Sequence, residues 1–489
     1  MTSRHVLAAL LTAALLVACA GPATGAADGG AACAGARDFD ADGQDDAVAG
    51  DPLAEVSGTW GAGAVRVVPV GSSATARSIV LTAPEPRAGD AFGWSVRAAY
   101  LDGDACMDIV VGAPYTTVDG EAGAGAVYVF YGRAGTRRAP VRLTAPSPER
   151  DAHFGWSLAT GQILGRPDAL VVGAPYQDAD GVTDSGAVYV YQPTDLSRPR
   201  TVTQETENVI GNSEEGDLYG WSLALGLMGG RHTALDLAVG TPYENDDGAG
   251  RQKGGAGTEN SGAVVLLLDV MTDDLSSVKW TLSEAARGVK DATGDRFGHA
   301  LAYGGYGGKP YLAVSAPLAD NGDAPDSGVI QLFRPASKGE LAPAGTIRSG
   351  EGPLSSGSPA AGSALGWSLT LLTTATGLSL AAGSPFESRD GPESGAIHLI
   401  PLTGGGASSV LTAPDPRPYD HFGWSLATSG SPAPYAPGTV LLAGSPDQSS
   451  GQGALTLARA GGTAHMLYPG EGSPAADVAP ADLGASVGG

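Results

Sequence analysis

The chain has 489 residues, a formal net charge of −24 at pH 7, 75 glycines and 34 prolines. Hydrophobic residues make up 42% of it, which excludes a disordered chain and suffices for a large core. The acidic charge argues against nucleic acid or an anionic membrane as partner, because either demands a basic face. Glycine and proline at this density interrupt helices and mark turns, which favours an all-β repeat architecture.

The first 27 residues are typical of an export signal. Arg4 and His5 precede an apolar run, Val6–Val17, that is too short to span a bilayer. Two cleavage positions are open: ordinary cleavage near Ala27, or a bacterial lipobox in which Cys19 receives a lipid anchor. We therefore expect an extracellular protein, secreted or held on the outer face of the membrane, with no membrane-spanning segment.

Two cysteines remain beyond the signal, Cys33 and Cys106. An oxidising compartment outside the cell favours a disulfide between them. Two free thiols are the alternative, since the sequence does not supply the Cα separation that a disulfide requires.

A short phrase recurs six times: an aromatic or apolar residue, then glycine, then in most copies Trp-Ser. The copies begin at Phe92, Phe154, Tyr219, Phe297, Leu365 and Phe422. Each is followed by an apolar strand ending in a small residue and proline, as in Gly112-Ala113-Pro114, and then by an alternating strand. A weaker fourth strand closes several units. The repeats predict a seven-bladed β-propeller of four-stranded antiparallel blades, spanning residues 28–470.

The first unit lacks the Phe-Gly phrase. The C-terminal segment, residues 471–489, contains Leu483-Gly484-Ala485-Ser486-Val487, which resembles it. We expect this segment to supply the inner strand of the first blade and so to close the ring. A disordered Ala/Pro/Gly tail is the alternative.

The Gly-Trp-Ser phrase around Ser157 has the look of a nucleophile elbow. A catalytic serine needs one base and one oxyanion hole, not equivalent copies around a ring, so we interpret the phrase as structural. On a strand, Phe154, Trp156 and Leu158 share a face, which predicts packing between blades for the repeated tryptophans; a sugar-stacking ring is the alternative. Trp60 lies outside the pattern and is the one tryptophan placed near a ligand.

These paired phrases resemble the FG-GAP repeats of the integrin α-subunit propeller, which also occur in exported bacterial proteins. The resemblance covers nearly all of the chain after the signal and implies the propeller fold. It also implies calcium loops between the first two strands of a blade. Partners would dock on the face that carries the turns before Phe-Gly and the acidic loops after Gly-x-Pro, such as residues 178–184.

One segment of the first unit, residues 38–46, has the spacing D-x-D-x-D-G-x-x-D. Ca²⁺ prefers six to eight oxygen ligands in a tight loop turned by glycine, so the segment predicts a calcium site. The alternative is a solvated acidic turn, but carboxylates so crowded repel one another without a cation. The predicted ligands are Asp38, Asp40, Asp42, the Gln44 carbonyl and Asp46.

The second unit keeps part of this pattern. Asp102, Asp104 and Asp108 remain, but Tyr100 replaces the first ligand and Ala105 replaces the turning glycine. These three aspartates are therefore the weaker metal candidates.

We expect a monomeric, calcium-stabilised, non-catalytic module that binds an extracellular protein or a polysaccharide. The alternative is a carbohydrate-active or esterase-like enzyme built on the same propeller. Such an enzyme would need an acid, a base and calcium ligands that converge on one cleft.

Overall fold

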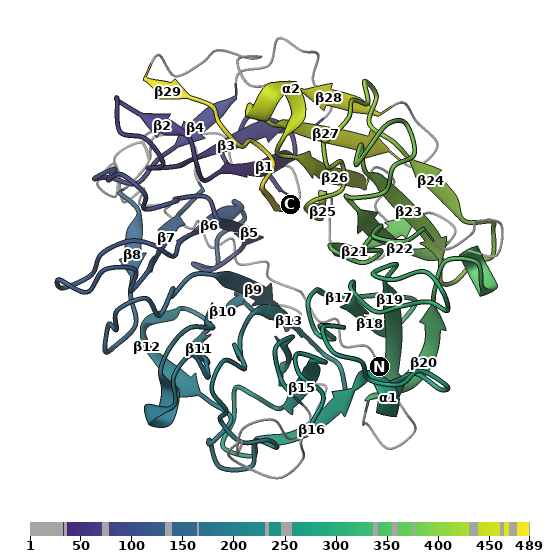
Figure 1. Cartoon of the computed structure of the whole chain (residues 1–489). Coiled ribbons are helices and arrows are strands. Elements are labelled where there is room, and N and C mark those ends of the chain that lie inside the picture. The colour runs from purple at the N-terminus through teal and green to yellow at the C-terminus, as the bar shows by residue number, and fades with distance from the viewer. Residues whose placement is uncertain are drawn as a thin grey trace, which may run out of the picture.

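The computed structural model describes residues 33, 37–70, 78–132, 139–163, 166–229, 234–245, 257–335, 341–354, 360–374, 377–429, 439–459, 464–468 and 477–488. The expected signal, including Cys19, lies outside these residues. Seven four-stranded antiparallel sheets surround a central axis (Figure 1). The predicted all-β, seven-bladed propeller is confirmed.

The sheets follow one another around the ring, and the strands of each run from the innermost outward. The first contains β30 (Ser486–Gly488), β1 (Asp46–Asp51), β3 (Ala64–Pro69) and β4 (Ile79–Leu81). The second contains β5 (Ser95–Ala99), β6 (Asp108–Ala113), β7 (Ala126–Phe130) and β8 (Val141–Leu143). The third contains β9 (Ser157–Gly161), β10 (Ala169–Ala174), β11 (Ala187–Gln192) and β12 (Asp195–Val202). The fourth contains β13 (Ser222–Gly226), β14 (Asp236–Thr241), β15 (Ala263–Leu268) and β16 (Ser276–Thr281).

The remaining three sheets continue the pattern. The fifth contains β17 (Leu301–Tyr306), β18 (Lys309–Ala316), β19 (Val329–Pro335) and β20 (Leu341–Ile347). The sixth contains β21 (Leu369–Thr374), β22 (Gly377–Ser384), β23 (Ala396–Pro401) and β24 (Ser409–Leu411). The seventh contains β25 (Leu426–Ser429), β26 (Val440–Ser445), β27 (Ala454–Arg459) and β28 (His465–Leu467).

Helix is confined to single turns in the described residues. They are α1 (Leu282–Ala285), α2 (Gln448–Gly451) and the 3-10 turns η1 (Ala179–Gly181) and η2 (Gly352–Leu354). Over the same residues, no helix has the length and apolarity needed to cross a membrane.

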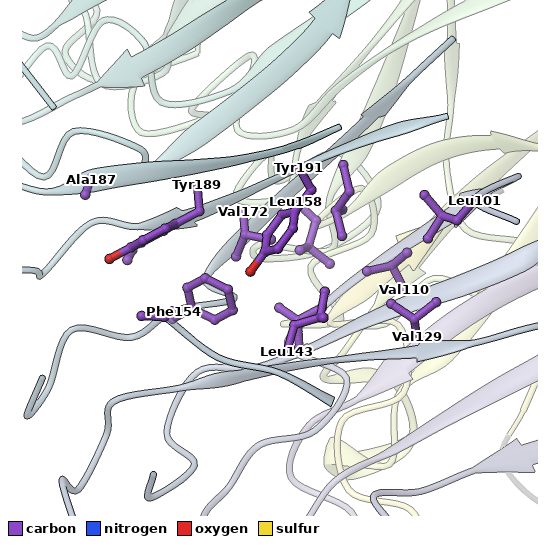
Figure 2. Packing of buried hydrophobic residues seen from close by; sticks show 14 of the residues in the cluster. Leu101, Val110, Val129, Leu143, Phe154, Leu158, Val172, Ala187, Tyr189 and Tyr191 are labelled. Carbon is purple, nitrogen blue, oxygen red and sulfur yellow. The ribbon is translucent and has the colours of Figure 1, made fainter. Parts of the chain in front are cut away.

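Apolar side chains fill the space between consecutive blades. Figure 2 shows one such layer, in which Val110, Val129 and Leu143 of the second blade face Phe154 and Tyr189 of the third. All five are buried. Removing each such side chain from water stabilises the fold by about 1.5–3 kcal/mol, so the blades are held together chiefly by these layers.

The first phrase of the repeat does not form a strand along its whole length. Strand β9 begins only at Ser157, and the preceding residues form a turn in which Gly155 has φ +94°. Phe154 is fully buried, whereas Trp156 stays partly exposed. The prediction that these two side chains share one face of a strand is wrong, because the left-handed glycine between them breaks the alternation.

The serine of the phrase joins neighbouring blades. The Ser157 hydroxyl donates to the carbonyl oxygen of Gly220 in the next blade at 2.6 Å. A Cβ on Gly173 would lie 2.3 Å from that same carbonyl oxygen, so only glycine allows this approach. Equivalent bonds recur around the ring, from Ser95 to Gly155, Ser222 to Gly298, Ser368 to Gly423, Ser425 to Gly484 and Ser486 to Gly93.

The two ends of the described chain meet in the first blade. Strand β30 pairs antiparallel with β1, with Ala49 opposite Val487. A second short ladder joins β2 (Glu55–Val56) to β29 (Val478–Ala479). In Figure 1 the yellow C-terminal segment therefore lies against the purple first sheet.

Candidate functional site

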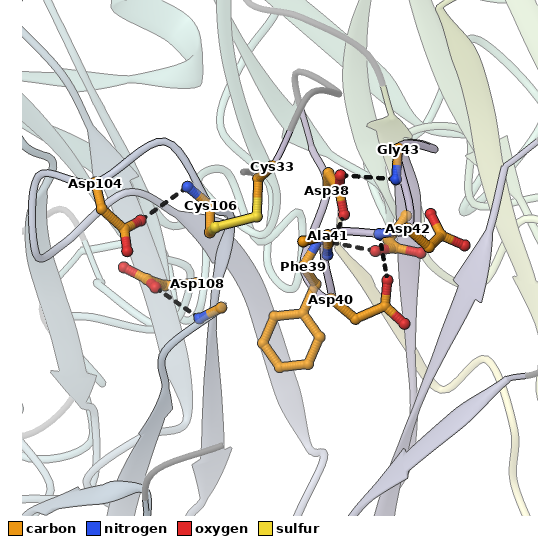
Figure 3. The surroundings of a disulfide bond; sticks show 12 residues. Cys33, Asp38, Phe39, Asp40, Ala41, Asp42, Gly43, Asp104, Cys106 and Asp108 are labelled. Atoms are coloured by element: carbon orange, nitrogen blue, oxygen red, sulfur yellow. Dashed lines mark hydrogen bonds between the residues drawn. A yellow bond between two sulfur atoms is a disulfide. The ribbon is translucent and has the colours of Figure 1, made fainter. Parts of the chain in front are cut away.

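The acidic loop before β1 brings three carboxylates together. Oxygens of Asp38, Asp40 and Asp42 all lie within 4.8 Å of one another. The loop is held by its own main chain: Ala41 and Gly43 N–H donate to Asp38 at 2.6 and 3.0 Å (Figure 3). Oxygens at this spacing fit a single hard cation, and the backbone bonds fix their positions before any ion arrives.

The other two predicted ligands are placed differently. The Asp46 carboxylate is buried and accepts a hydrogen bond from the Phe39 N–H at 2.9 Å. Burial, together with the charges of Asp40, Asp42 and Asp38, raises the pKa of Asp46 to about 7. The Gln44 side chain donates through Nε2 to Asp42 at 3.1 Å, and the ligand predicted at this residue is its main-chain carbonyl.

The matching loop of the second blade does not gather its carboxylates in this way. Both oxygens of the buried Asp108 are used: the Leu101 N–H donates to one at 2.7 Å and the Gly132 N–H to the other at 3.0 Å. Asp104 accepts from the Cys106 N–H at 2.8 Å. Asp108 thus satisfies backbone donors, and sequence reasoning missed that role.

A disulfide joins the two loops. Cys33 is bonded to Cys106, with their Cα atoms 5.1 Å apart across a sequence separation of 73 residues. The bond ties the segment that leads into the Asp38 loop to the second blade (Figure 3).

A series of partly exposed aromatic side chains surrounds the axis, and we call it the aromatic arc. Its members, each in contact with the next, are Trp94, Trp156, Trp221, His299, Trp367 and Trp424. Successive ring centroids are 4.7, 4.9, 6.0, 4.7 and 5.2 Å apart. Each tryptophan contacts the adjacent blade, as the packing hypothesis requires, but none of the five is fully buried.

His299 is the member that the tryptophan pattern did not reveal. Burial, and then the charge of Arg296, lowers its pKa to about 4. The imidazole is therefore neutral at physiological pH and continues the arc as an uncharged ring. The arc is interrupted at the copy contributed by the C-terminal segment, where Ala485 replaces tryptophan.

A second layer of rings packs beside the arc. Tyr115 lies edge-on to Trp94 at 5.5 Å, Tyr176 to Trp156 at 5.4 Å and Phe386 to Trp367 at 5.1 Å. Each of these residues directly follows the proline of a Gly-x-Pro phrase, so the sequence does carry a signal for this layer. Trp60 is 62% exposed on the loop between β2 and β3 and contributes no ring contact among the described residues.

One histidine near the arc lies between carboxylates. Nδ1 of His421 is 2.6 Å from Asp447 and Nε2 is 3.1 Å from Glu393. Both ring nitrogens contact carboxylates, so neither faces a nucleophile in this geometry. This geometry joins two loops instead of forming a base–nucleophile pair.

Two segments of the chain match a known repeat family. The FG-GAP repeat matches residues 92–130, and a second FG-GAP repeat description matches residues 139–191. These matches span the second blade and the first three strands of the third, β9 to β11, and the same phrases recur in the fourth to seventh blades. The propeller therefore contains FG-GAP repeats.

Curated proteins with similar sequences include both integrins and an enzyme. The FG-GAP chain is 36% identical to rat integrin alpha-7 and 35% identical to human integrin alpha-6, each over 156 residues. Those alignments cover 31% of this chain and 12% of each integrin. It is 32% identical over 199 residues to bovine phosphatidylinositol-glycan-specific phospholipase D, covering 37% of this chain and 22% of that protein. The chain thus aligns with less than a quarter of each of these relatives.

Proposed function

We propose that this FG-GAP propeller is an exported, calcium-stabilised, non-catalytic module that binds an extracellular protein or a polysaccharide. The observation that carries the proposal is the aromatic arc. Partly exposed rings collected on one site offer apolar contact area with little loss of conformational entropy, which is typical of binding hot spots. Aromatic faces also suit the apolar faces of sugars.

The charge of the chain narrows the choice of ligand. Asp447 and Glu393 lie beside the arc through His421, and the whole chain carries −24. A neutral or basic ligand surface is therefore favoured over an acidic one.

Calcium is the cation that we assign to the Asp38 loop. Three clustered carboxylates offer the hard oxygen donors that Ca²⁺ prefers, and Gly43, with φ +86°, provides the turn. A bound ion would offset the burial of charge and the repulsion that together raise the pKa of Asp46, and it would fix the loop beside the disulfide. Its role is structural.

Calcium should raise the melting temperature of the protein, and Asp40→Asn with Asp42→Asn should abolish that rise. At 100 times the dissociation constant, selective binding to the folded state contributes about 2.7 kcal/mol. Differential scanning calorimetry with excess Ca²⁺ and with chelator measures the change in melting temperature. Asp102→Asn with Asp104→Asn is the matched control and should keep the response. An unchanged response in the first variant would rule out this loop.

Trp156→Ala combined with Trp221→Ala should weaken ligand binding by at least tenfold, since a hot-spot ring is worth about 2 kcal/mol or more. The ligand is found first by screening the protein against immobilised glycans and extracellular proteins; affinities then follow by surface plasmon resonance. Val141→Ala, at an exposed side chain on the outermost strand of the second blade, is the control and should leave binding unchanged. If the double variant binds as tightly as the parent, the arc is not the contact surface.

The similarity to a phospholipase D is the observation that favours an enzymatic alternative. That relative is named for an enzymatic activity, but the alignment covers only 22% of it. Among the described residues, His421 has both nitrogens occupied and Ser157 donates to a backbone carbonyl, which favours binding over catalysis.

A further inference from the structure

A cavity lies on the axis of the propeller, surrounded by the innermost strand of every blade. The strands β5, β9, β13, β17, β21, β25 and β30 form a closed ring in which each contacts the next (Figure 1). All seven contribute residues to the lining of the cavity, whose volume is about 180 Å³. Since a water molecule takes about 30 Å³ in the liquid, the cavity has room for a small ion as well as water.

The repeat places one residue of each blade at the same level of this lining, three positions after the tryptophan position of the phrase. In the second blade that residue is Arg97. The other blades carry small residues there, namely Ala159, Ala224, Ala302, Thr370, Ala427 and Gly488. The open space beside Arg97 results from these small side chains, and the arginine is the exception to the repeat.

Arg97 is also the one charged residue among the described residues that line the cavity. Its guanidinium donates through Nη1 to the Val96 carbonyl oxygen at 2.9 Å, and no described residue forms an ion pair with it. Burial lowers the pKa of Arg97, whereas at buried Arg66 the charge of Asp51 opposes the same effect. Arginine stays protonated in proteins, so the cavity contains a permanent positive charge that no carboxylate of the described chain neutralises.

We propose that Arg97 binds a small oxyanion, such as phosphate or a short carboxylate, on the axis of the propeller. The planar guanidinium fork matches two oxygens of one carboxylate or phosphate group. Partial exclusion of water strengthens the attraction between the two charges. Thr370 and Thr428 line the same cavity, and their hydroxyls are further donors for an anion.

The charge of the whole chain makes this a local property of Arg97. A net charge of −24 repels anions from the protein surface, so an anion is retained only where a basic group is close. The site is separate from the ligand proposed for the aromatic arc, and either can exist without the other. Water alone is the alternative occupant of the cavity.

Isothermal titration calorimetry of the calcium-free protein with sodium phosphate, and separately with sodium acetate, at constant ionic strength tests the proposal. The parent should bind one equivalent of phosphate or of acetate, and Arg97→Ala should weaken that binding at least tenfold. The fold should tolerate this change, because four other blades have alanine at the same position. Arg87→Ala, which removes a guanidinium from a side chain that is 58% exposed, is the matched control and should leave binding unchanged.

The two anions distinguish the classes of ligand. Binding of phosphate alone assigns the site to tetrahedral oxyanions, and binding of acetate alone assigns it to carboxylates. Arg97→Lys keeps the charge but loses the planar fork, so it should bind more weakly than the parent.

Thermal melts give a second measurement of the same site. The anion that binds should raise the melting temperature of the parent and leave that of the Arg97→Ala variant unchanged. Should Arg97→Ala fail to fold, Arg97→Met, which keeps an apolar stem, serves with the same expectation. If neither anion binds the parent, or if the loss of Arg97 leaves the affinity unchanged, there is no anion site on the axis.

Discussion

Deletion of residues 477–488 is expected to abolish cooperative folding of the propeller. The deletion removes β30 and leaves β1 without its inner neighbour. It also removes Leu483 and Val487, which are 2% and 3% exposed and whose burial contributes about 1.5–3 kcal/mol each. Lost hydrogen bonds, including that from Ser486 to Gly93, add about 1 kcal/mol each. The total approaches the roughly 5–15 kcal/mol that typically separates folded from unfolded chains.

Far-UV and near-UV circular dichroism with thermal melts would measure the effect. A gentler variant, Leu483→Ala, should cost about 2–5 kcal/mol while the protein remains folded. Ile210→Ala, at a side chain that is 49% exposed, is the control and should change stability little. A truncated protein that melts with the parent's midpoint and cooperativity would show that the ring does not depend on its C-terminal strand.

Replacing both Cys33 and Cys106 with serine is expected to lower the free energy of unfolding by about 4 kcal/mol, the chain-entropy value for a loop closed across 73 residues. The reason is that the oxidised chain has fewer unfolded conformations. The segment leading into the Asp38 loop would also lose its covalent connection to the second blade, so calcium affinity should fall at the same time.

Guanidinium titrations of the parent protein and of the double serine variant measure the difference in their free energies of unfolding. The parent measured in reducing agent should approach the variant, and the variant should not respond to reductant. Equal midpoints for the oxidised parent and the variant would mean that the bond contributes nothing to stability.

The propeller could be predicted because its signal is repeated. Each copy of the Phe-Gly and Gly-x-Pro phrases is weak alone, but six copies in register leave few folds that fit. What the pattern did not supply was the local backbone. Gly155 takes a left-handed conformation, so Phe154 is buried while Trp156 stays at the surface of the ring. The alternation of side chains between the two faces of a strand requires every residue to be extended. One left-handed glycine breaks that alternation.

The candidate calcium site and a second cluster of carboxylates, Glu214, Asp217 and Glu244, differ in how far apart their residues lie in sequence. Asp38, Asp40 and Asp42 are close neighbours, so their clustering follows from a single turn. Glu214 and Asp217 precede β13 whereas Glu244 follows β14, so the clustering of these three carboxylates depends on how the fourth blade packs against the turn that enters it. The burial of Asp217 likewise depends on tertiary packing, which no sequence motif encodes.

The first sheet contains strands from both ends of the described chain, and this has a consequence for the order of biosynthesis. Strand β1 is made early, yet its partner β30 is made only after the strands of all the other blades. Until β30 emerges, β1 has an unpaired edge, and the first and seventh blades lack the hydrogen bonds that join them. A nascent chain therefore cannot complete the ring while its later blades are still being made. A chain exported through a membrane channel would likewise have to cross the membrane completely before β30 can pair with β1 and close the ring.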